Sequence, residues 1–259
     1  LEVYKSPDGI EKIGTVPAGS AHCLLAETDG MFAVRFGENI GYVDNRYCMI
    51  NVPEYLGNLC NYNIPNSYAS VYRIHGVDIP KVTDTVIYGY QDVLQANGLY
   101  LVPVLYPAAQ KLLQAALSAR DLGYRLKIYD SYRPYGATKE IYALTQKILG
   151  EYAPDGEQTL QELMTDKDRF GLGDFLASVT SRHTYGVALD LTLETLGGQE
   201  MQMQTVIHDL SWYSALENNN ANADMLQKLM VAEGFATLKS EWWHFQDAES
   251  FDSLKPAYL

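Results

Sequence analysis

Cysteine is scarce in this sequence: three residues among 259, with no Cys-x-x-Cys pair. Cys23, Cys48 and Cys60 are an odd number and widely spaced, which argues against a disulfide framework and against a cysteine zinc cluster. We interpret all three as small buried hydrophobic residues. Long apolar runs are missing as well. None approaches the roughly 20 residues needed to cross a bilayer, so the sequence predicts no membrane-spanning segment.

Positive charge is also low. Lys and Arg number 19 against 32 Asp and Glu, which gives a formal net charge of −13. A field of this sign repels phosphate backbones and anionic lipids, so we do not expect nucleic acid as a partner. Hydrophobic residues make up 47% and charged residues 20% of the chain. These values are typical of a folded globular protein, and the length suffices for one large or two smaller domains.

The first 57 residues differ in pattern from the rest. Five short β-prone runs, of which YCMINV is the last, alternate with turn signals such as Asp29-Gly30. Five short strands with such closely spaced turns indicate a small all-β barrel. The run MFAVRFGENIGYVDNRYCMINVPEYLG resembles the bacterial SH3-like domain, a module often attached to cell-wall enzymes. The resemblance implies an SH3-like barrel over 1–57 that contacts either the cell wall or the rest of the chain. A purely structural subdomain is the alternative.

After a polar, turn-rich stretch at 58–67, which we predict to be a linker, both helix and strand patterns occur. Apolar residues at helical spacing predict three helices, near 107–122, 137–149 and 222–233. Runs with strand character predict three strands, near 124–130, 184–193 and 235–246. Because helices and strands do not alternate regularly, residues 68–259 are predicted to form one α+β domain.

The segment SRHTYGVALDLTL combines a histidine with a carboxylate. Residues 187–193 alternate strictly, which predicts a strand with one face on the core and Asp190 on the other face. Gly186 allows a sharp turn before this strand, so His183 is expected to fold back toward Asp190. An imidazole and a carboxylate that converge supply half of a zinc site. Taken alone, such a pair is more often a simple hydrogen bond.

The segment LKSEWWHFQ supplies the other half. Catalytic zinc needs three protein ligands, an open position for water, and a carboxylate outside the ligand set to accept the water proton. His183, Asp190 and His244 as ligands, with Glu241 as the base, meet this requirement. The alternative interpretation of this segment is an aromatic strand in the core.

The segment KIYDSYRPYGATKE places Asp130 and Arg133 where a predicted strand ends. An arginine there can donate two parallel N–H bonds to a carboxylate or to a developing oxyanion, and Asp130 can hold it in place. The alternative is a structural ion pair that braces the turn.

Together these segments resemble the VanX-type D-alanyl-D-alanine dipeptidases, within the zinc D,D-peptidases of the Hedgehog/D,D-peptidase fold. SRHTYGVALD fits the pattern Ser-x-His-x-x-Gly-x-Ala-x-Asp, EWWH fits Glu-x-Trp-His, and YDSYRPYGA fits the Asp-x-Tyr-Arg-Pro loop. The resemblance runs from about Asn61 to the C-terminus. It implies a zinc peptidase of α+β fold that hydrolyses D-Ala-D-Ala or a D-Ala-terminated peptidoglycan stem peptide.

The resemblance also implies a role for each site residue. Glu241 is expected to act as general base, and Arg133 to stabilise the tetrahedral intermediate with support from Asp130. Arg133→Lys is not expected to preserve activity, because lysine lacks the planar fork. The resemblance implies three zinc ligands, His183, Asp190 and His244.

One position departs from the family. In the dipeptidases an acidic residue after a Met-x-Thr segment helps to hold the substrate ammonium, whereas here MQTVIHDLSW aligns His208 with it, followed by Asp209. A neutral or cationic histidine does not favour an ammonium group. Ser181, His208 and Asp209 are therefore candidate substrate-binding residues. A role for His208 behind the metal ligands or in the core is an equal alternative.

Two other functions stay open on the sequence alone. One is a D,D-carboxypeptidase or endopeptidase that acts on longer cell-wall stem peptides. The other is a zinc-bearing peptide-binding protein of the same fold without catalysis, against which Glu241 counts, because a structural zinc site has no use for an unligated carboxylate. The expected location is secreted or associated with the cell wall, with a cytoplasmic location also open.

Overall fold

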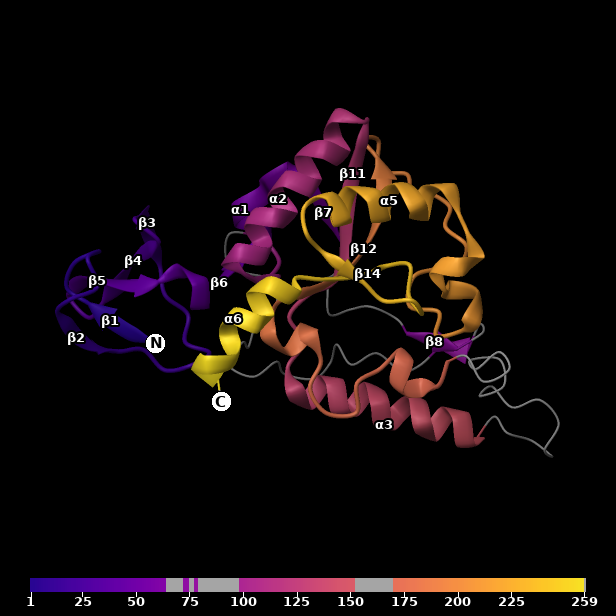
Figure 1. Cartoon of the computed structure of the whole chain (residues 1–259), viewed down its shortest axis with the longest axis horizontal. Coiled ribbons are helices and arrows are strands. Elements are labelled where there is room, and N and C mark those ends of the chain that lie inside the picture. The colour runs from indigo at the N-terminus through magenta and orange to yellow at the C-terminus, as the bar shows by residue number, and fades with distance from the viewer. Residues whose placement is uncertain (64–71, 75–76, 79–97, 152–169, 259) are drawn as a thin grey trace.

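The structure is a computed structural model that describes residues 1–63, 72–74, 77–78, 98–151 and 170–258. Figure 1 shows a small N-terminal β-sheet at one end of the molecule and a larger part in which helices surround a second sheet. The fold class is therefore α+β, as predicted. Within the described ranges, no helix has the length and apolar character needed to cross a membrane.

The N-terminal sheet is antiparallel, with strand order β2-β1-β5-β4-β3. Its strands are β1 (Glu2–Tyr4), β2 (Lys12–Thr15), β3 (Leu24–Thr28), β4 (Met31–Phe36) and β5 (Asn39–Asp44). The turn between β4 and β5 contains Gly37 at a φ of 61°, a left-handed conformation that glycine adopts without a Cβ clash. Sequence reasoning missed β1, because three residues are too few to show an alternating pattern.

The fifth predicted N-terminal strand, YCMINV, does form but pairs elsewhere. It becomes β6 (Met49–Asn51), which pairs antiparallel with β10 (Pro103–Leu105) of the larger part. A short helix, α1 (Val52–Leu56), follows it. The chain then enters the main sheet as β7 (Cys60–Tyr62). The stretch predicted as a linker thus contains a strand of the main sheet, and its residues 64–67 lie outside the described residues.

The main sheet has the strand order β13-β14-β12-β11-β7. The strands not yet introduced are β11 (Tyr124–Asp130), β12 (Ala188–Thr195), β13 (Ala236–Thr237) and β14 (His244–Gln246). Only β7 runs parallel to its neighbour, β11; the other pairs are antiparallel. Strand β11 has the predicted bounds. Strand β12 begins later than predicted, because residues Arg182–Tyr185 form a 3-10 helix, η6. A separate ribbon pairs β8 (Arg73–Ile74) with β9 (Val77–Asp78).

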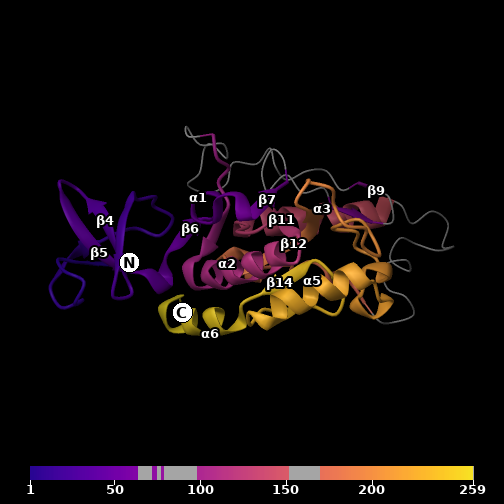
Figure 2. The ribbon, with the colours of Figure 1, turned by 90° about the horizontal axis from the view of Figure 1, so that it is seen from above.

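Helices flank the main sheet. The described ones of eleven residues or more are α2 (Tyr106–Asp121), α3 (Tyr135–Glu151), α5 (Ala221–Ala232) and α6 (Ala248–Tyr258). Short 3-10 helices are η1 (Asn45–Tyr47), η2 (Gly57–Leu59), η5 (Leu172–Asp174), η7 (Trp212–Ser214) and η8 (Leu216–Asn218). Helices α2 and α5 lie side by side against the sheet (Figures 1 and 2), and α3 lies apart from them at the bottom of the view in Figure 1. Helices α2, α3 and α5 fall where the periodicity predicts, whereas α6 was not predicted.

The core lies between the main sheet and these helices. Helix α2 turns a buried face of small and apolar residues toward the sheet: Ala108, Ala109, Leu112, Ala115, Ala116 and Ala119. Such small side chains allow the helix to approach the strands closely. Strand β12 has the predicted alternation, and its second face, which carries Asp190, Thr192 and Glu194, is buried as well. Both faces of the central strand are covered, and its polar residues therefore need partners.

Candidate active site with a metal-binding triad

Strand register brings two of the candidate ligands together. Asp190 on β12 lies directly opposite His244 on β14 and opposite Asp130 on β11, so the three residues form one row across the sheet. Directly opposed residues of antiparallel strands have Cβ atoms about 4.5–5.5 Å apart and share a face. Positions more than 50 residues apart in sequence thus become immediate neighbours.

His183 joins this row from η6, which precedes β12. The turn between them depends on Gly186, which caps η6 at a φ of 67°. The left-handed conformation favours glycine, and space is tight as well, because a Cβ there would lie 2.8 Å from Met49 Cε and 3.2 Å from the backbone nitrogen of Leu105. The backbone N–H of Arg133 donates to the carbonyl oxygen of His183 over 3.1 Å, which ties the η6 turn to the loop after β11.

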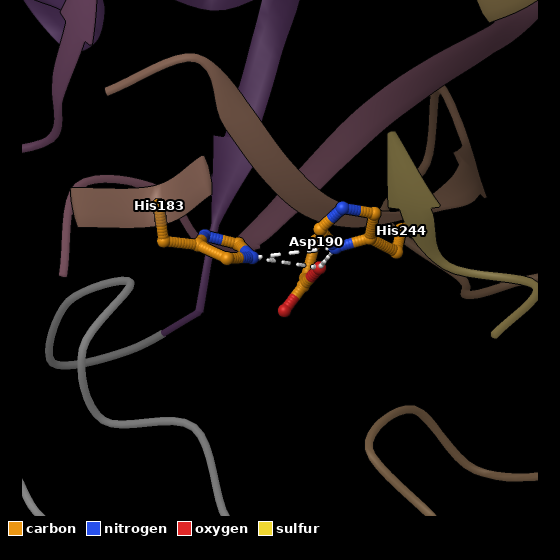
Figure 3. A group of neighbouring side chains, drawn as sticks. All are labelled: His183, Asp190 and His244. Carbon is orange, nitrogen blue, oxygen red and sulfur yellow. Dashed lines mark hydrogen bonds and ion pairs between the residues drawn. The ribbon is translucent and has the colours of Figure 1, made fainter. Parts of the chain in front are cut away.

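The side chains of His183, Asp190 and His244 point toward a common centre (Figure 3). His183 Nε2 lies 3.3 Å from His244 Nδ1 and 3.4 Å from Asp190 Oδ1, and His244 Nδ1 lies 3.0 Å from the same oxygen. All three side chains are buried, and one ligand atom from each lies within 4.8 Å of the others. Two imidazole nitrogens and one carboxylate oxygen, so arranged, are a donor set that fits Zn²⁺.

The ring nitrogens that face away from this centre also have partners. His183 Nδ1 lies 2.7 Å from the carbonyl oxygen of Ser131, and His244 Nε2 lies 3.3 Å from Gln246 Oε1. Both partners can accept a hydrogen bond, so each imidazole can carry a proton on its outer nitrogen and turn a lone pair toward the centre when a metal is bound. This proton placement is the one that a metal-binding imidazole needs.

The electrostatics of the triad favour its metal-binding protonation states. Burial by itself raises the pKa of Asp190. Before a metal binds, attraction to His183 and the hydrogen bonds that the imidazoles of His183, His208 and His244 make with the carboxylate outweigh burial and hold that pKa well below its usual range. Burial lowers the pKa of His244 despite the neighbouring Asp190. An ionised aspartate and a neutral histidine are the forms that coordinate metal.

Glu241 lies beside the triad and is buried. Its Oε2 atom is 3.6 Å from His244 Nδ1, and both residues line the same cavity. Burial, followed by the negative charge of Asp190, raises the pKa of Glu241 well above its usual value, although Arg133 opposes this. A carboxyl group with a raised pKa can both accept and return a proton near neutral pH.

Arg133 is held by a buried network. Its Nε and Nη2 atoms lie 2.8 and 2.5 Å from Asp130 Oδ2, and Nη2 also donates to the hydroxyl of Tyr72. That hydroxyl donates in turn to Asp130 Oδ2 over 2.9 Å. Burial alone disfavours the guanidinium charge, but Asp130, Tyr72 and Asp190 keep the pKa of Arg133 above its usual value. Arg133 therefore presents a fixed positive charge, with Nη2 3.7 Å from Asp190 Oδ2.

A cavity of about 650 Å³ opens onto these groups. The sequence-predicted residues along its wall are Ser181, His183, Asp190, Glu241, His244 and Arg133. The other two substrate-binding candidates lie elsewhere in the described structure. His208 is fully buried, with Nε2 3.1 Å from Asp190 Oδ2, and does not line the cavity. Asp209 pairs through its backbone with Arg73 in an isolated bridge, also away from the cavity wall.

Sequence reasoning missed three participants: Tyr72, the carbonyl of Ser131, and Gln246. The signal for Gln246 was present, because residues two apart on a strand share a face and Gln246 follows His244 at that spacing. No comparable signal marks Tyr72, which reaches Asp130 and Arg133 from 58 and 61 residues away. A backbone carbonyl such as that of Ser131 carries no signal in the residue type.

Two imidazoles and a carboxylate around one point, with a separate carboxylate and a fixed guanidinium in the same cavity, define a metal-dependent hydrolase class of site. The chain belongs to the D-Ala-D-Ala dipeptidase family, whose profile matches residues 64–256. It is accordingly a hydrolase of the metallopeptidase type.

Curated relatives agree with this family. The D-alanyl-D-alanine dipeptidase of Escherichia coli is 27% identical over 179 residues, which cover 66% of this chain and 81% of the relative. The enzyme of the same name from Streptomyces coelicolor is 31% identical over 148 residues, covering 52% of this chain and 70% of the relative. Its counterpart in Enterococcus faecalis is 29% identical over 147 residues, covering 53% and 69%.

Two solved structures are also similar. One is the vancomycin-resistance D,D-pentapeptidase VanY of a VanB-type cassette in complex with Zn(II), with a TM-score of 0.37, 16% identity, and coverage of 75% of this chain and 95% of that one. The other is VanYB in complex with D-alanine-D-alanine, with a TM-score of 0.36, 18% identity, and coverage of 74% and 93%.

Proposed function

We propose that this chain is a zinc-dependent peptidase that hydrolyses D-Ala-D-Ala or related short, D-Ala-terminated peptidoglycan peptides. The observation that carries the proposal is the convergence of His183, Asp190 and His244 within 4.8 Å, with Glu241 Oε2 only 3.6 Å from His244 Nδ1 in the same cavity. The family match and the names of the curated relatives support D-Ala-D-Ala as the substrate class.

In this proposal His183 Nε2, His244 Nδ1 and Asp190 Oδ1 hold Zn²⁺. When bound, the ion supplies Lewis-acid chemistry, which lowers the pKa of water and polarises a carbonyl group. The chain prepares the site for this by placing an acceptor at the outer nitrogen of each imidazole, the Ser131 carbonyl for His183 and Gln246 for His244. Little reorganisation is then needed when the metal enters.

Glu241 is the proton carrier. Its carboxylate accepts a proton from the attacking water and passes it to the leaving amine as the peptide bond breaks. Burial and the nearby Asp190 raise the pKa of Glu241, so its protonated form is accessible during the reaction.

Arg133 stabilises negative charge in the cavity. As the water adds to the scissile carbonyl, the carbonyl oxygen becomes an oxyanion, and a prepositioned guanidinium lowers the energy of that state. Asp130 and Tyr72 hold the guanidinium before substrate arrives. The ordering of this long side chain is therefore complete in the free enzyme.

The test compares Glu241→Gln with Glu249→Gln. Each variant removes one carboxylate charge, but Glu249 is exposed and pairs with Lys111 on the outer surface. Zinc-loaded wild type is expected to release D-alanine from D-Ala-D-Ala or from a stem pentapeptide ending in D-Ala-D-Ala. Glu241→Gln is expected to lower kcat by about 10²–10⁴-fold, the usual contribution of a general base. Zinc content is expected to stay at the wild-type level in both variants.

The relative turnover of the two peptides distinguishes a dipeptidase from a carboxypeptidase. Faster turnover of the dipeptide supports a dipeptidase, and faster turnover of the pentapeptide supports a carboxypeptidase that acts on wall precursors. A zinc-loaded wild type that cleaves neither peptide would contradict the proposed activity. Full activity of Glu241→Gln would contradict the assigned base.

We also propose that the activity is located outside the cell or at the cell wall. The SH3-like resemblance of the N-terminal residues supports this location, because such modules are often attached to wall enzymes. Fractionation of the producing cells, followed by immunodetection, tests it. Recovery in the cytoplasmic fraction alone would contradict the proposal.

A further inference from the structure

His208 is a buried polar residue that the proposed reaction does not use. Its side chain is inaccessible to solvent, and its Nε2 atom lies 3.1 Å from Asp190 Oδ2. Asp190 thus divides its two oxygens: Oδ1 faces the nitrogens of His183 and His244, and Oδ2 faces His208, with the Arg133 guanidinium farther from it at 3.7 Å. A carboxylate held at both oxygens has little freedom to rotate.

The imidazole of His208 is itself tightly held. It stacks on the Tyr72 ring with centroids 4.4 Å apart and planes 13° apart, and it meets Trp243 edge-on at 5.6 Å. The backbone of His208 is left-handed at a φ of 60°, and its carbonyl accepts a hydrogen bond from the Arg73 N–H over 3.0 Å. A non-glycine residue in this conformation is uncommon and persists where its surroundings over-determine it.

The two ring nitrogens of His208 differ. Nδ1 is buried and has no hydrogen-bond partner among the residues that the structure describes. A neutral imidazole with its proton on Nε2 fits this arrangement, since it donates to Asp190 Oδ2 and leaves only a lone pair unmatched at Nδ1. A buried N–H without an acceptor at Nδ1 would be more costly.

We propose that His208 is a positioning residue that orients Asp190 as a metal ligand. It thereby completes a set in which each ligand has an outer partner, Ser131 for His183, Gln246 for His244 and His208 for Asp190. Such outer hydrogen bonds fix ligand orientation and tune metal affinity. The inference rests on the proposed zinc site, and it gives His208 a role other than contact with substrate.

The test uses two variants that differ mainly in one donor group. In His208→Gln the amide nitrogen can take the place of Nε2 and donate to Asp190 Oδ2. In His208→Met the side chain has a similar length and flexibility but no N–H donor. Any loss that both variants share reports the missing ring stack on Tyr72. A difference between them reports the hydrogen bond.

The readout is zinc affinity, measured by competition with a chromophoric chelator. His208→Met is expected to raise the Kd for zinc by about 10–100-fold, the effect of removing an outer-shell partner. His208→Gln is expected to retain most of the wild-type affinity. The visible absorption of the Co²⁺-substituted protein is expected to change in His208→Met and to be restored in His208→Gln.

The melting temperature of each metal-free variant separates folding from metal binding. Should His208→Met not fold, His208→Asn serves instead, because asparagine tolerates a positive φ but is too short to reach Asp190. It is expected to bind zinc as weakly as predicted for His208→Met.

Equal zinc affinity in wild type and in a folded His208→Met would overturn the inference and leave the proposed function intact. Equal weakening in His208→Gln and His208→Met would also overturn it, since packing would then be the cause. A wild-type chain that binds no zinc would overturn both the proposed function and this inference.

Discussion

The N-terminal sheet and the main sheet differ in the exposure of their charged side chains. All five residues of β3 are exposed, and ion pairs in the N-terminal sheet such as Lys12–Glu2 lie in solvent. In β12, by contrast, seven of the eight residues are buried, Asp190 among them. Exposed pairs contribute little because water screens them, whereas buried groups interact strongly and need matched partners. The chemistry lies where both faces of a strand are covered.

The two regions nevertheless share a core residue. Tyr106 begins α2 of the larger part, yet it packs in the small cluster of the N-terminal sheet and meets Phe32 edge-on at 4.6 Å. Its hydroxyl donates to Glu27 Oε2 over 2.6 Å. The N-terminal sheet therefore completes its core with a side chain from the other region, and its stability depends on that contact.

The largest expected effect comes from a variant that removes one metal ligand and leaves the N-terminal sheet unchanged. His183→Ala is expected to lower bound zinc from one ion per chain to the background level, because two ligands hold zinc far less tightly than three. Activity falls to background with it. Metal analysis by mass spectrometry measures this, with His22→Ala as control, since His22 is an exposed histidine of the N-terminal region. Undiminished zinc in His183→Ala would contradict the assigned ligand set.

A second pair of variants alters the core of the N-terminal sheet. Tyr106→Ala is expected to destabilise the N-terminal sheet by about 3–5 kcal/mol, the usual cost of deleting a buried aromatic ring. Tyr106→Phe keeps the ring and removes the hydroxyl with its bond to Glu27, which is expected to cost about 1 kcal/mol. Hydrogen exchange of the β4 and β5 amides measures both effects.

Zinc content should stay unchanged in both Tyr106 variants. Loss of zinc together with loss of β4 protection would show that the two regions unfold as one unit.

The smallest effect concerns the three thiols. Burial raises the pKa of Cys48 and of Cys60 to about 12, whereas Cys23 is exposed. Because only the thiolate reacts, these two thiols stay unreactive at pH 8 and gain reactivity only as the pH rises toward 12. Peptide mapping after iodoacetamide treatment at pH 8 should find Cys23 alkylated first. Faster labelling of Cys60 would indicate local opening at β7.

The three thiols also show how well burial can be predicted from residue type. The interpretation of all three as buried hydrophobic residues is right for Cys60, partly right for Cys48 and wrong for Cys23. Cys23 directly precedes β3, an edge strand whose five residues are all exposed, and residue type alone does not reveal such a position. The helices α2, α3 and α5 were predictable, in contrast, because a long amphipathic period repeats many times within each of them.

In the candidate site, too, local features could be predicted from the sequence and long-range contacts could not. The local pairs were readable, since Gly186 between His183 and Asp190, and the three-residue step from Glu241 to His244, are properties of one short segment each. The alternation of β12 was readable too, and it placed Asp190 on the face opposite the apolar side chains. Alternation reports which residues share a face. It does not report what covers the second face.

The sequence by itself therefore determined the residue types and local spacing of the site, because turns and strand periodicity act over a few residues. Only the tertiary structure decided that Asp130, Asp190 and His244 share one row across three strands, and that Asp190 Oδ2 meets His208. These contacts join distant segments, and they depend on strand register and on the packing that holds each strand in place.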